Sequence, residues 1–223
     1  MLFRKKYNIE DIGRLTKLKS PERKNYSIVI IDDDLTMAKK ELLGSLGFVV
    51  TILRDIDNIN EIQNFDIIVC DVRGVGKKYD SKYGGAFIIK EIAHHYPQKY
   101  IIVCSGSTFK VNYAQYFRLA DSELDKGSDS TEWAKVLDGG IKNLSSPELV
   151  WERTRKNFIT NEVPTEIINK IEQAFIKSIV KKDSQILDKL VTKNQNLLSN
   201  EYVAFAANSL VSYTSSILGS LIA

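Results

Sequence analysis

Short hydrophobic runs alternate with helical patterns between residues 26 and 145. Each run is rich in β-branched residues and nearly continuous, as expected of strands that are covered on both faces. The four clear runs are SIVIID (27–32), FVVTIL (48–53), FDIIVCD (65–71) and YIIVCS (100–105), and a weaker one lies in LADSELDK (119–126). Strands that alternate with helices predict an α/β fold with a doubly wound parallel sheet of five strands.

The segments between these runs place apolar residues at helical spacing. Residues 35–47 end at Gly47, a helix stop signal, and residues 84–97 end at Pro97. In the first segment we expect one side of the helix to carry the apolar residues Met37, Leu42, Leu43 and Leu46. Both segments are therefore predicted to be helices that cover the sheet.

From residue 146 onward the pattern is helical and carries no strand signal. Pro164 suits the start of a helix, and the apolar residues that follow it recur at helical spacing. The expected helices span 146–159, 164–182, 183–198 and 200–223. The chain is thus expected to consist of a basic N-terminal arm (1–25), an α/β domain (26–145) and an all-α helical domain (146–223).

The last helical segment, from Tyr202 to Ala223, carries no charge and is long enough to raise the question of a membrane anchor. Asn208 and several serines dilute it, however, and Val203, Ala207 and Leu210 recur at helical spacing. We therefore expect an amphipathic helix that is buried in a bundle or a dimer, and not a membrane partner.

Composition fits an ordinary soluble protein, because 43% of the 223 residues are hydrophobic and 26% are charged. The formal net charge of +3 is too small to indicate a nucleic acid partner. Basic residues gather in the N-terminal arm, which we interpret as a solvated extension with a short helix around Ile9 to Leu18. The C-terminal helices have nearly balanced charge and no basic recognition helix, which argues against DNA binding.

Cys70 and Cys104 sit inside apolar runs, where buried free thiols are expected, and this points to a reducing compartment. The start of the chain, MLFRKKYNIED, lacks the apolar core of a signal peptide. We therefore expect a cytoplasmic protein.

Polar side chains that can take part in catalysis or metal binding lie where the predicted strands end. Asp32 and Asp33 close the first strand, Asp71 the third and Ser105 the fourth, and Lys126 follows the fifth. The carboxyl ends of parallel strands form one rim, so these groups should converge. Clustered carboxylates disfavour each other's ionisation, so a cation should compensate them. Oxygen ligands of this kind favour a hard divalent cation, most simply Mg²⁺.

Because these residues follow the strands in this order, residues 26–145 resemble the receiver domains of two-component response regulators. The resemblance implies a sheet with the strand order 2-1-3-4-5 and a role for Asp71 as the acceptor of a phosphoryl group. The donor would be a histidine kinase or a small phosphodonor. Ser105 would hydrogen-bond one phosphoryl oxygen, and Lys126 would pair with another.

The same resemblance implies how Mg²⁺ would be held. Asp33 and Asp71 would bind the ion directly, Asp32 would act through a water molecule, and the backbone carbonyl of Arg73 would complete the protein ligands. Metal and lysine together would neutralise the charge on the transferred phosphoryl group. The protein would then be a phosphoacceptor signalling protein and not an enzyme, and its C-terminal helices would mediate homodimerisation or partner contact.

Three departures from the receiver pattern stand in the loops and in the fifth strand. The loop after Asp71, VRGVGKKYDSKYGG, is long and rich in glycine, and it offers Arg73, Lys77 and Lys78 as further groups that reach toward the phosphoryl site. Gly127 replaces the proline that usually follows the lysine, and Glu123 replaces the usual aromatic switch residue.

Two alternatives remain. IVIIDDDLT also fits the D-x-D-x-T motif of haloacid-dehalogenase-type phosphatases, with Asp32 as nucleophile and Asp34 as acid or base. That interpretation gives Asp71 no role, and we expect Asp34 instead to be a helix N-cap or first-turn residue. The other alternative is a pseudo-receiver that serves as a scaffold without being phosphorylated.

Overall fold

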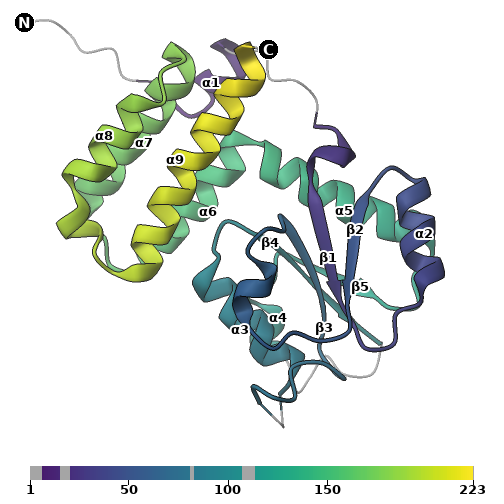
Figure 1. Cartoon of the computed structure of the whole chain (residues 1–223). Helices are drawn as coiled ribbons and strands as arrows, with labels where there is room; N and C mark the ends of the chain where they lie inside the picture. The colour runs from purple at the N-terminus through teal and green to yellow at the C-terminus, as the bar shows by residue number, and fades with distance from the viewer. Residues whose placement is uncertain (1–6, 16–20, 81–82, 107–113, 223) are drawn as a thin grey trace, which may run out of the picture. The chain divides into compact units, whose positions relative to one another are not determined.

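A computed structural model describes residues 7–15, 21–80, 83–106 and 114–222 of the chain (Figure 1). The chain divides into two compact units. One is Pro21–Ser145, and the other joins Met1–Ser20 to Ser146–Ala223. Among the described residues, all strands lie in the first unit, and the second unit is helical.

The Pro21–Ser145 unit is built on a five-stranded parallel sheet with the order β2-β1-β3-β4-β5. Its strands are β1 (Ser27–Ile31), β2 (Val49–Leu53), β3 (Ile67–Asp71), β4 (Tyr100–Ser105) and β5 (Ser122–Asp125). Every run that the hydrophobic pattern marked as a strand is a strand. The predicted α/β class and the strand order 2-1-3-4-5 are thus confirmed.

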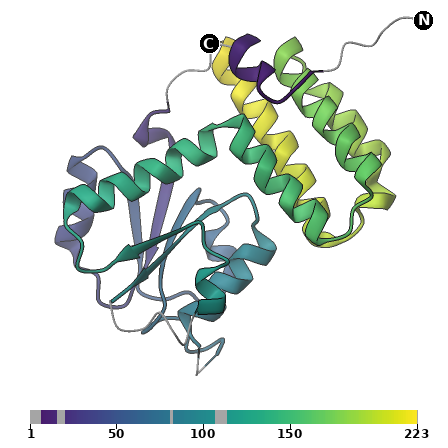
Figure 2. The same ribbon diagram turned by 180° about the vertical axis from the view of Figure 1, so that it is seen from behind.

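Helices cover both faces of this sheet (Figures 1 and 2). They are α2 (Met37–Ser45), α3 (Gly85–His95), α4 (Ala114–Phe117) and α5 (Ser130–Ser145), with 3-10 turns η1 (Arg23–Asn25) and η2 (Ile59–Ile62). Val29 and Ile31 belong to the core that includes α3, whereas Ile28 and Ile30 belong to the core that includes α2 and α5. Because successive strand residues face opposite cores, both must be apolar, and this explains the continuous hydrophobic runs.

Helix α2 buries less of its apolar surface than the sequence pattern predicts. Leu43 is fully buried, but Met37, Leu42 and Leu46 are exposed. The helix has nine residues and packs at the edge of the sheet beside β2, so a single stripe of side chains reaches the core. The four apolar residues that we expected on one side of this helix therefore do not share one buried face.

The two cysteines are buried free thiols, as expected. Cys70 lies in the core on the α3 side of the sheet and Cys104 in the core on the other side. Burial, together with the nearby carboxylates of Asp32 and Asp71, raises the pKa of the Cys104 thiol to about 12. This thiol therefore stays protonated near neutral pH.

The second unit contains the expected C-terminal helices. They are α6 (Pro147–Thr160), α7 (Thr165–Lys181), α8 (Gln185–Lys193) and α9 (Glu201–Ile222), with a 3-10 turn η3 (Gln195–Leu198) after α8. The Ser146 hydroxyl accepts a hydrogen bond from Leu149 N–H and so caps α6. Pro164 immediately precedes α7, in agreement with its predicted place at a helix start.

The core of the helical unit is built around stacked aromatic rings. The rings of Trp151 and Phe175 lie 6.1 Å apart, centroid to centroid. Trp151 Nε1 donates a hydrogen bond of 2.9 Å to Glu172, so the polar edge of the indole is satisfied at the rim of the core. The stripe of apolar residues on α7 is therefore core and not a groove for a partner.

The expected separate N-terminal arm is wrong for residues 7–15. Helix α1 (Asp11–Leu15) packs in the helical unit, and Ile12 is 1% exposed within its core. The backbone of Tyr7 pairs with the side-chain amide of Gln173 through bonds of 3.3 and 2.8 Å. The basic composition of the segment hid this packing, in which the side chains of Tyr7, Ile9 and Ile12 contact the core. Residues 1–6 and 16–20 of the expected arm lie outside the described residues.

Helix α9 is amphipathic, as expected. Val203, Ala207 and Leu210 are buried in the core of the helical unit, whereas Phe205 is exposed. In the described part of the chain, we find no helix with both the length and the apolar character needed to cross a bilayer.

Candidate functional site

The side chains that the sequence marked at the strand ends lie at one edge of the sheet. Asp32 directly follows β1, Asp71 is the last residue of β3, Ser105 is the last residue of β4, and Lys126 directly follows β5. The registers of β1 with β3, of β3 with β4 and of β4 with β5 place each of these positions within one residue of the next along the sheet edge. Parallel strands thus bring together residues from four segments of the sequence.

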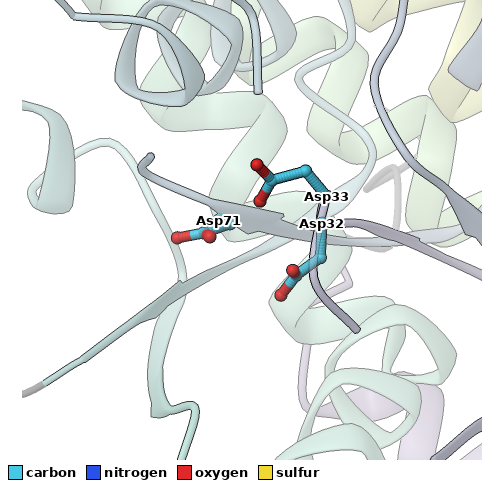
Figure 3. A group of neighbouring side chains, drawn as sticks. All are labelled: Asp32, Asp33 and Asp71. Carbon is cyan, nitrogen blue, oxygen red and sulfur yellow. The ribbon is translucent and has the colours of Figure 1, made fainter. Parts of the chain in front are cut away.

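The acidic residues form a group that has the composition of a metal site. One oxygen each from Asp32, Asp33 and Asp71 lies within 4.8 Å of the others (Figure 3). Asp32 and Asp71 are buried, with 1% and 5% exposure, and Asp33 is exposed. Carboxylates that differ in burial in this way can present oxygens to an ion that keeps part of its water shell.

A buried acceptor in this group has no hydrogen-bond donor. Asp32 Oδ1 accepts hydrogen bonds from Asp34 N–H at 2.9 Å and from Lys126 Nζ at 3.0 Å. Asp32 Oδ2 lies 3.0 Å from the same Nζ, but outside hydrogen-bonding geometry, and it has no other partner. A buried carboxylate oxygen in this state needs a further positive partner. The donor set and this oxygen fit a hard divalent cation.

Lys126 compensates the negative charge of the cluster. Its Nζ lies 2.5 Å from Asp71 Oδ2, in addition to its contacts with Asp32. Partial burial alone lowers the pKa of Lys126, but the hydrogen bonds and charges of Asp71 and Asp32 outweigh it, so the pKa is raised above its ordinary value. The amine therefore stays protonated, and it compensates part of the negative charge of the acidic strand end.

The buried carboxyl group of Asp71 directs one oxygen toward the backbone N–H of Arg73. Burial raises its pKa, while Lys126 and the backbone N–H of Arg73 act in the opposite direction. That N–H donates a hydrogen bond of 3.2 Å to Asp71 Oδ1. The contact holds the first turn of the loop after β3 beside the carboxylate. The predicted role of the Arg73 carbonyl as a metal ligand stays a prediction.

Ser105 and Lys126 are connected through the backbone. Lys126 N–H donates a hydrogen bond of 3.2 Å to the Ser105 carbonyl, and Ser105 is buried. After Lys126 the chain turns back, and Gly127 N–H donates a bond of 2.7 Å to the Asp125 carboxylate. A proline at position 127 would have no N–H for this bond. The glycine at this position, which departs from the receiver pattern, therefore permits a turn that a proline would not.

The long loop after Asp71 is anchored by apolar side chains and shaped by glycine. Val72 and Val75 are buried in the core on the α3 side. Gly74 has a φ of +85°, and a Cβ placed there would lie 2.2 Å from Asp33 Oδ1. The backbone at Gly74 therefore passes directly against the Asp33 carboxylate, which a side chain would prevent.

Sequence reasoning missed the residue that holds this loop from the side of β2. Asp55 Oδ1 accepts hydrogen bonds from Gly76 N–H at 2.7 Å and from Ile56 N–H at 2.8 Å. The neighbouring Arg54 donates a bond of 2.7 Å to the Asp33 carbonyl. A signal was present in the sequence, because an Asp in the turn after a strand often accepts backbone N–H bonds. Its partner Gly76, however, lies in the loop after β3.

One cation that we expected to reach toward the phosphoryl site is directed elsewhere. Lys78 pairs with Asp57, and both side chains are largely exposed. Lys77 is exposed as well, and the Arg73 contact recorded at the site is made by its backbone N–H. For Lys78 the expectation was wrong, because its amine pairs with the exposed carboxylate of Asp57 in the segment after β2.

Asp34 lies outside the acidic group. Among the described residues, that group comprises Asp32, Asp33 and Asp71. The helix after β1 begins at Met37 with Thr36 as its N-cap, so the expected capping role of Asp34 was also wrong. Its recorded contact is a backbone N–H bond to Asp32.

Comparison of the sequence with protein-family models and with curated proteins gives no match. Comparison with solved structures gives matches to receiver domains. A CheY-like response regulator receiver domain protein from Methanospirillum hungatei is 17% identical, with a TM-score of 0.46, over 53% of this chain and 95% of that one. The NtrX receiver domain from Brucella abortus is 16% identical, with a TM-score of 0.44, over 52% and 98%. A response regulator from Thermotoga maritima is 15% identical, with a TM-score of 0.43, over 52% and 98%.

These matches cover about half of the chain, and the remainder, from Ser146 onward, is helical. The observed strand order, independently of these scores, is the one that the resemblance in the sequence implied. Residues 21–145 thus form a doubly wound parallel α/β fold with the strand order 2-1-3-4-5, an order that receiver domains and flavodoxins share.

Proposed function

We propose that this protein is a response regulator of two-component phosphorelay signalling that accepts a phosphoryl group on Asp71. The supporting observation is the contact of Lys126 Nζ with both Asp71 and Asp32, beside Asp33. Phosphoryl transfer needs a positioned nucleophile and positive groups that neutralise the charge of the transferred group. The donor would be a histidine kinase or a small phosphodonor such as acetyl phosphate.

In the proposed reaction, a carboxylate oxygen of Asp71 attacks the phosphorus atom of a phosphohistidine. An O–P bond forms while the N–P bond breaks, and the electron pair of that bond leaves with the imidazole. The nucleophile needs no base, because a carboxylate is already ionised near neutral pH. Lys126 would then pair with one oxygen of the acyl phosphate, and the Ser105 hydroxyl would donate a hydrogen bond to another.

Mg²⁺ bound at this edge would neutralise charge on the phosphoryl oxygens during transfer. Asp33 and Asp71 would hold it directly, Asp32 would act through a water molecule, and the Arg73 carbonyl would add a neutral ligand. Gly74 supports this assignment, since its backbone limits where the Asp33 carboxylate can lie.

The helical unit would carry the output as a homodimerisation or partner-binding module. Its helices show no basic recognition helix, so we do not propose DNA as the partner. Apolar residues that the unit leaves exposed include Ile159 on α6, Leu197 on η3 and Phe205 on α9.

Intact mass after incubation with acetyl phosphate tests the proposal. We expect one phosphoryl adduct on the full chain when Mg²⁺ is present, none when it is chelated, and none in Asp71→Ala. Asp57→Ala is the matched control, because it removes an exposed aspartate whose recorded ion pair is with Lys78. This variant should be phosphorylated as the wild type is.

Other outcomes select the alternatives. Absence of an adduct in the wild type would favour a pseudo-receiver scaffold. Continuous phosphate release that survives Asp71→Ala but not Asp32→Asn would favour the phosphatase interpretation and overturn the proposal.

A further inference from the structure

Two consecutive residues after β2 contact the two loops that carry the acidic group. Arg54 Nη1 donates a 2.7 Å hydrogen bond to the Asp33 carbonyl in the loop after β1. Asp55 Oδ1 accepts a 2.7 Å hydrogen bond from Gly76 N–H in the loop after β3. A single short segment therefore bonds to the loop of Asp33 and to the loop that follows Asp71.

The loop after β3 is confined at Gly76 from the opposite side as well. A Cβ at Gly76 would lie 2.7 Å from the backbone of Gly84, and the φ of Gly76 is +70°. The Gly76 carbonyl accepts hydrogen bonds from Tyr79 N–H and Asp80 N–H. These contacts fix Gly76 within its own loop, and the bond to Asp55 then attaches that loop to the end of β2.

This attachment bears on Asp33 through Gly74. Between Gly76 and the acidic site, Val75 is fully buried and Gly74 lies against the Asp33 carboxylate. The segment is too short to absorb a shift of Gly76 without moving Gly74, because Val75 is held in the core. The position of Gly76 thus limits the space available to the Asp33 side chain.

We infer that Asp55 is a positioning residue for the acidic site. By fixing the amide of Gly76, its carboxylate holds Gly74 against Asp33 and so sets the geometry in which Asp33 and Asp71 receive a cation. Asp55 acts through the loop and is no ligand itself, since the group found among the described residues comprises Asp32, Asp33 and Asp71. The inference rests on the proposed Mg²⁺ site, and outer groups of this kind tune metal affinity by orienting the ligands.

Two substitutions at Asp55 separate the effect of where its acceptor oxygen lies from the effect of its negative charge. Asp55→Asn keeps an oxygen acceptor at the same place and loses the charge, whereas Asp55→Glu keeps the charge and displaces the carboxylate by one methylene. Asp57→Ala is the charge control, because it removes an aspartate from the same segment whose partner is Lys78. Circular dichroism verifies the fold of each variant, and Asp55→Ala replaces Asp55→Glu should the latter fail to fold.

The measurement is Mg²⁺ affinity of the full chain, by calorimetric titration with MgCl₂ and no phosphodonor. We expect Asp55→Glu to weaken binding about tenfold. Asp55→Asn and Asp57→Ala should remain within about twofold of the wild type, because a single charge outside the site is screened. A purely electrostatic role of Asp55 predicts the reverse order, with Asp55→Asn the weaker binder.

Wild-type affinity in Asp55→Glu, or equal losses in Asp55→Asn and Asp55→Glu, would overturn the inference. A lowered unfolding midpoint with unchanged Mg²⁺ affinity would overturn it too, because that is the result of a merely structural contact. If the wild type binds no Mg²⁺ and forms no phosphoryl adduct, the proposed function fails, and the inference fails with it. If the wild type binds the ion and the variants at position 55 do not differ, only the inference fails.

Discussion

Lys126 Nζ lies 2.5 Å from Asp71 Oδ2, and this ion pair joins the ends of β3 and β5 across the intervening β4. The amine contacts Asp32 as well, so one cation serves two buried carboxylates. Without it, these carboxylates would repel each other in a setting that water screens poorly. The stability of the sheet edge and the proposed chemistry therefore depend on the same residue.

Replacement of Lys126 by methionine should destabilise the Pro21–Ser145 unit. The variant leaves Asp32 and Asp71 without their cation, and we expect a loss of about 1–2 kcal/mol in the free energy of unfolding, since the lysine is partly exposed. Mg²⁺ at the proposed site should restore more stability to the variant than to the wild type, because it would supply the positive charge that the missing ammonium no longer provides. Urea unfolding with MgCl₂ or with a chelator measures both effects.

Lys135→Met is the control for that experiment, because Lys135 forms an exposed pair with Glu132 on α5. It should change the free energy of unfolding by less than about 0.5 kcal/mol. Equal stability of Lys126→Met and the wild type in the chelator would show that the pair contributes nothing.

Gly74→Ala should damage the acidic site directly. The new Cβ would lie 2.2 Å from Asp33 Oδ1, at a φ of +85° that alanine rarely adopts, so the loop or the carboxylate must move. We expect Mg²⁺ affinity to fall at least about tenfold.

Gly44→Ala on α2 is the matched control for Gly74→Ala. Its Cβ would meet nothing within 4 Å, and the change should stabilise the helix by about 0.5–1 kcal/mol. Unchanged affinity in Gly74→Ala would show that the close approach does not constrain Asp33.

Lys99 should make the free energy of unfolding of the Pro21–Ser145 unit depend on pH in the alkaline range. Its Nζ donates hydrogen bonds to the backbone carbonyls of Gln63 and Phe65, and burial lowers its pKa to about 8, against a weaker opposite effect of Asp66. Between pH 8 and the ordinary value of 10.5, the unfolded chain binds a proton that the folded chain has lost. Stability therefore rises with pH in this window and is lowest below pH 8.

The comparison of wild type with Lys99→Met isolates this effect from other titrating groups. The free energy of unfolding of the wild type, relative to the variant, should increase by up to about 3 kcal/mol from pH 8 to 10.5. Urea unfolding at half-unit pH steps provides the measurement. A difference that stays constant across the window would mean that Lys99 keeps its ordinary pKa.

A cavity created on α9 should destabilise the helical unit. Leu210 is 1% exposed, so Leu210→Ala should lower the free energy of unfolding by about 2–4 kcal/mol. Leu197→Ala makes the same chemical change at a position that is 53% exposed, and it should cost less than about 1 kcal/mol. Chemical denaturation followed by circular dichroism detects the transition, because the second unit is helical. Similar effects of the two variants would contradict the placement of α9.

The sequence alone determined the strands, the helices of the second half, and the order of Asp32, Asp71, Ser105 and Lys126 at the strand ends. These features follow from local properties: a buried parallel strand must be apolar on both sides, and a helix must repeat its apolar residues every three or four positions. The convergence of the site was also predictable, because parallel strands end at one edge.

Tertiary structure alone decided which residues hold that site. The bond between Asp55 and Gly76 and the approach of Gly74 to Asp33 join segments that only the order of the strands brings together. The docking of Tyr7 on Gln173 likewise joins the N-terminal segment to α7. Such contacts leave no periodic trace in the sequence, because each needs one donor and one acceptor whose separation along the chain is set by the fold.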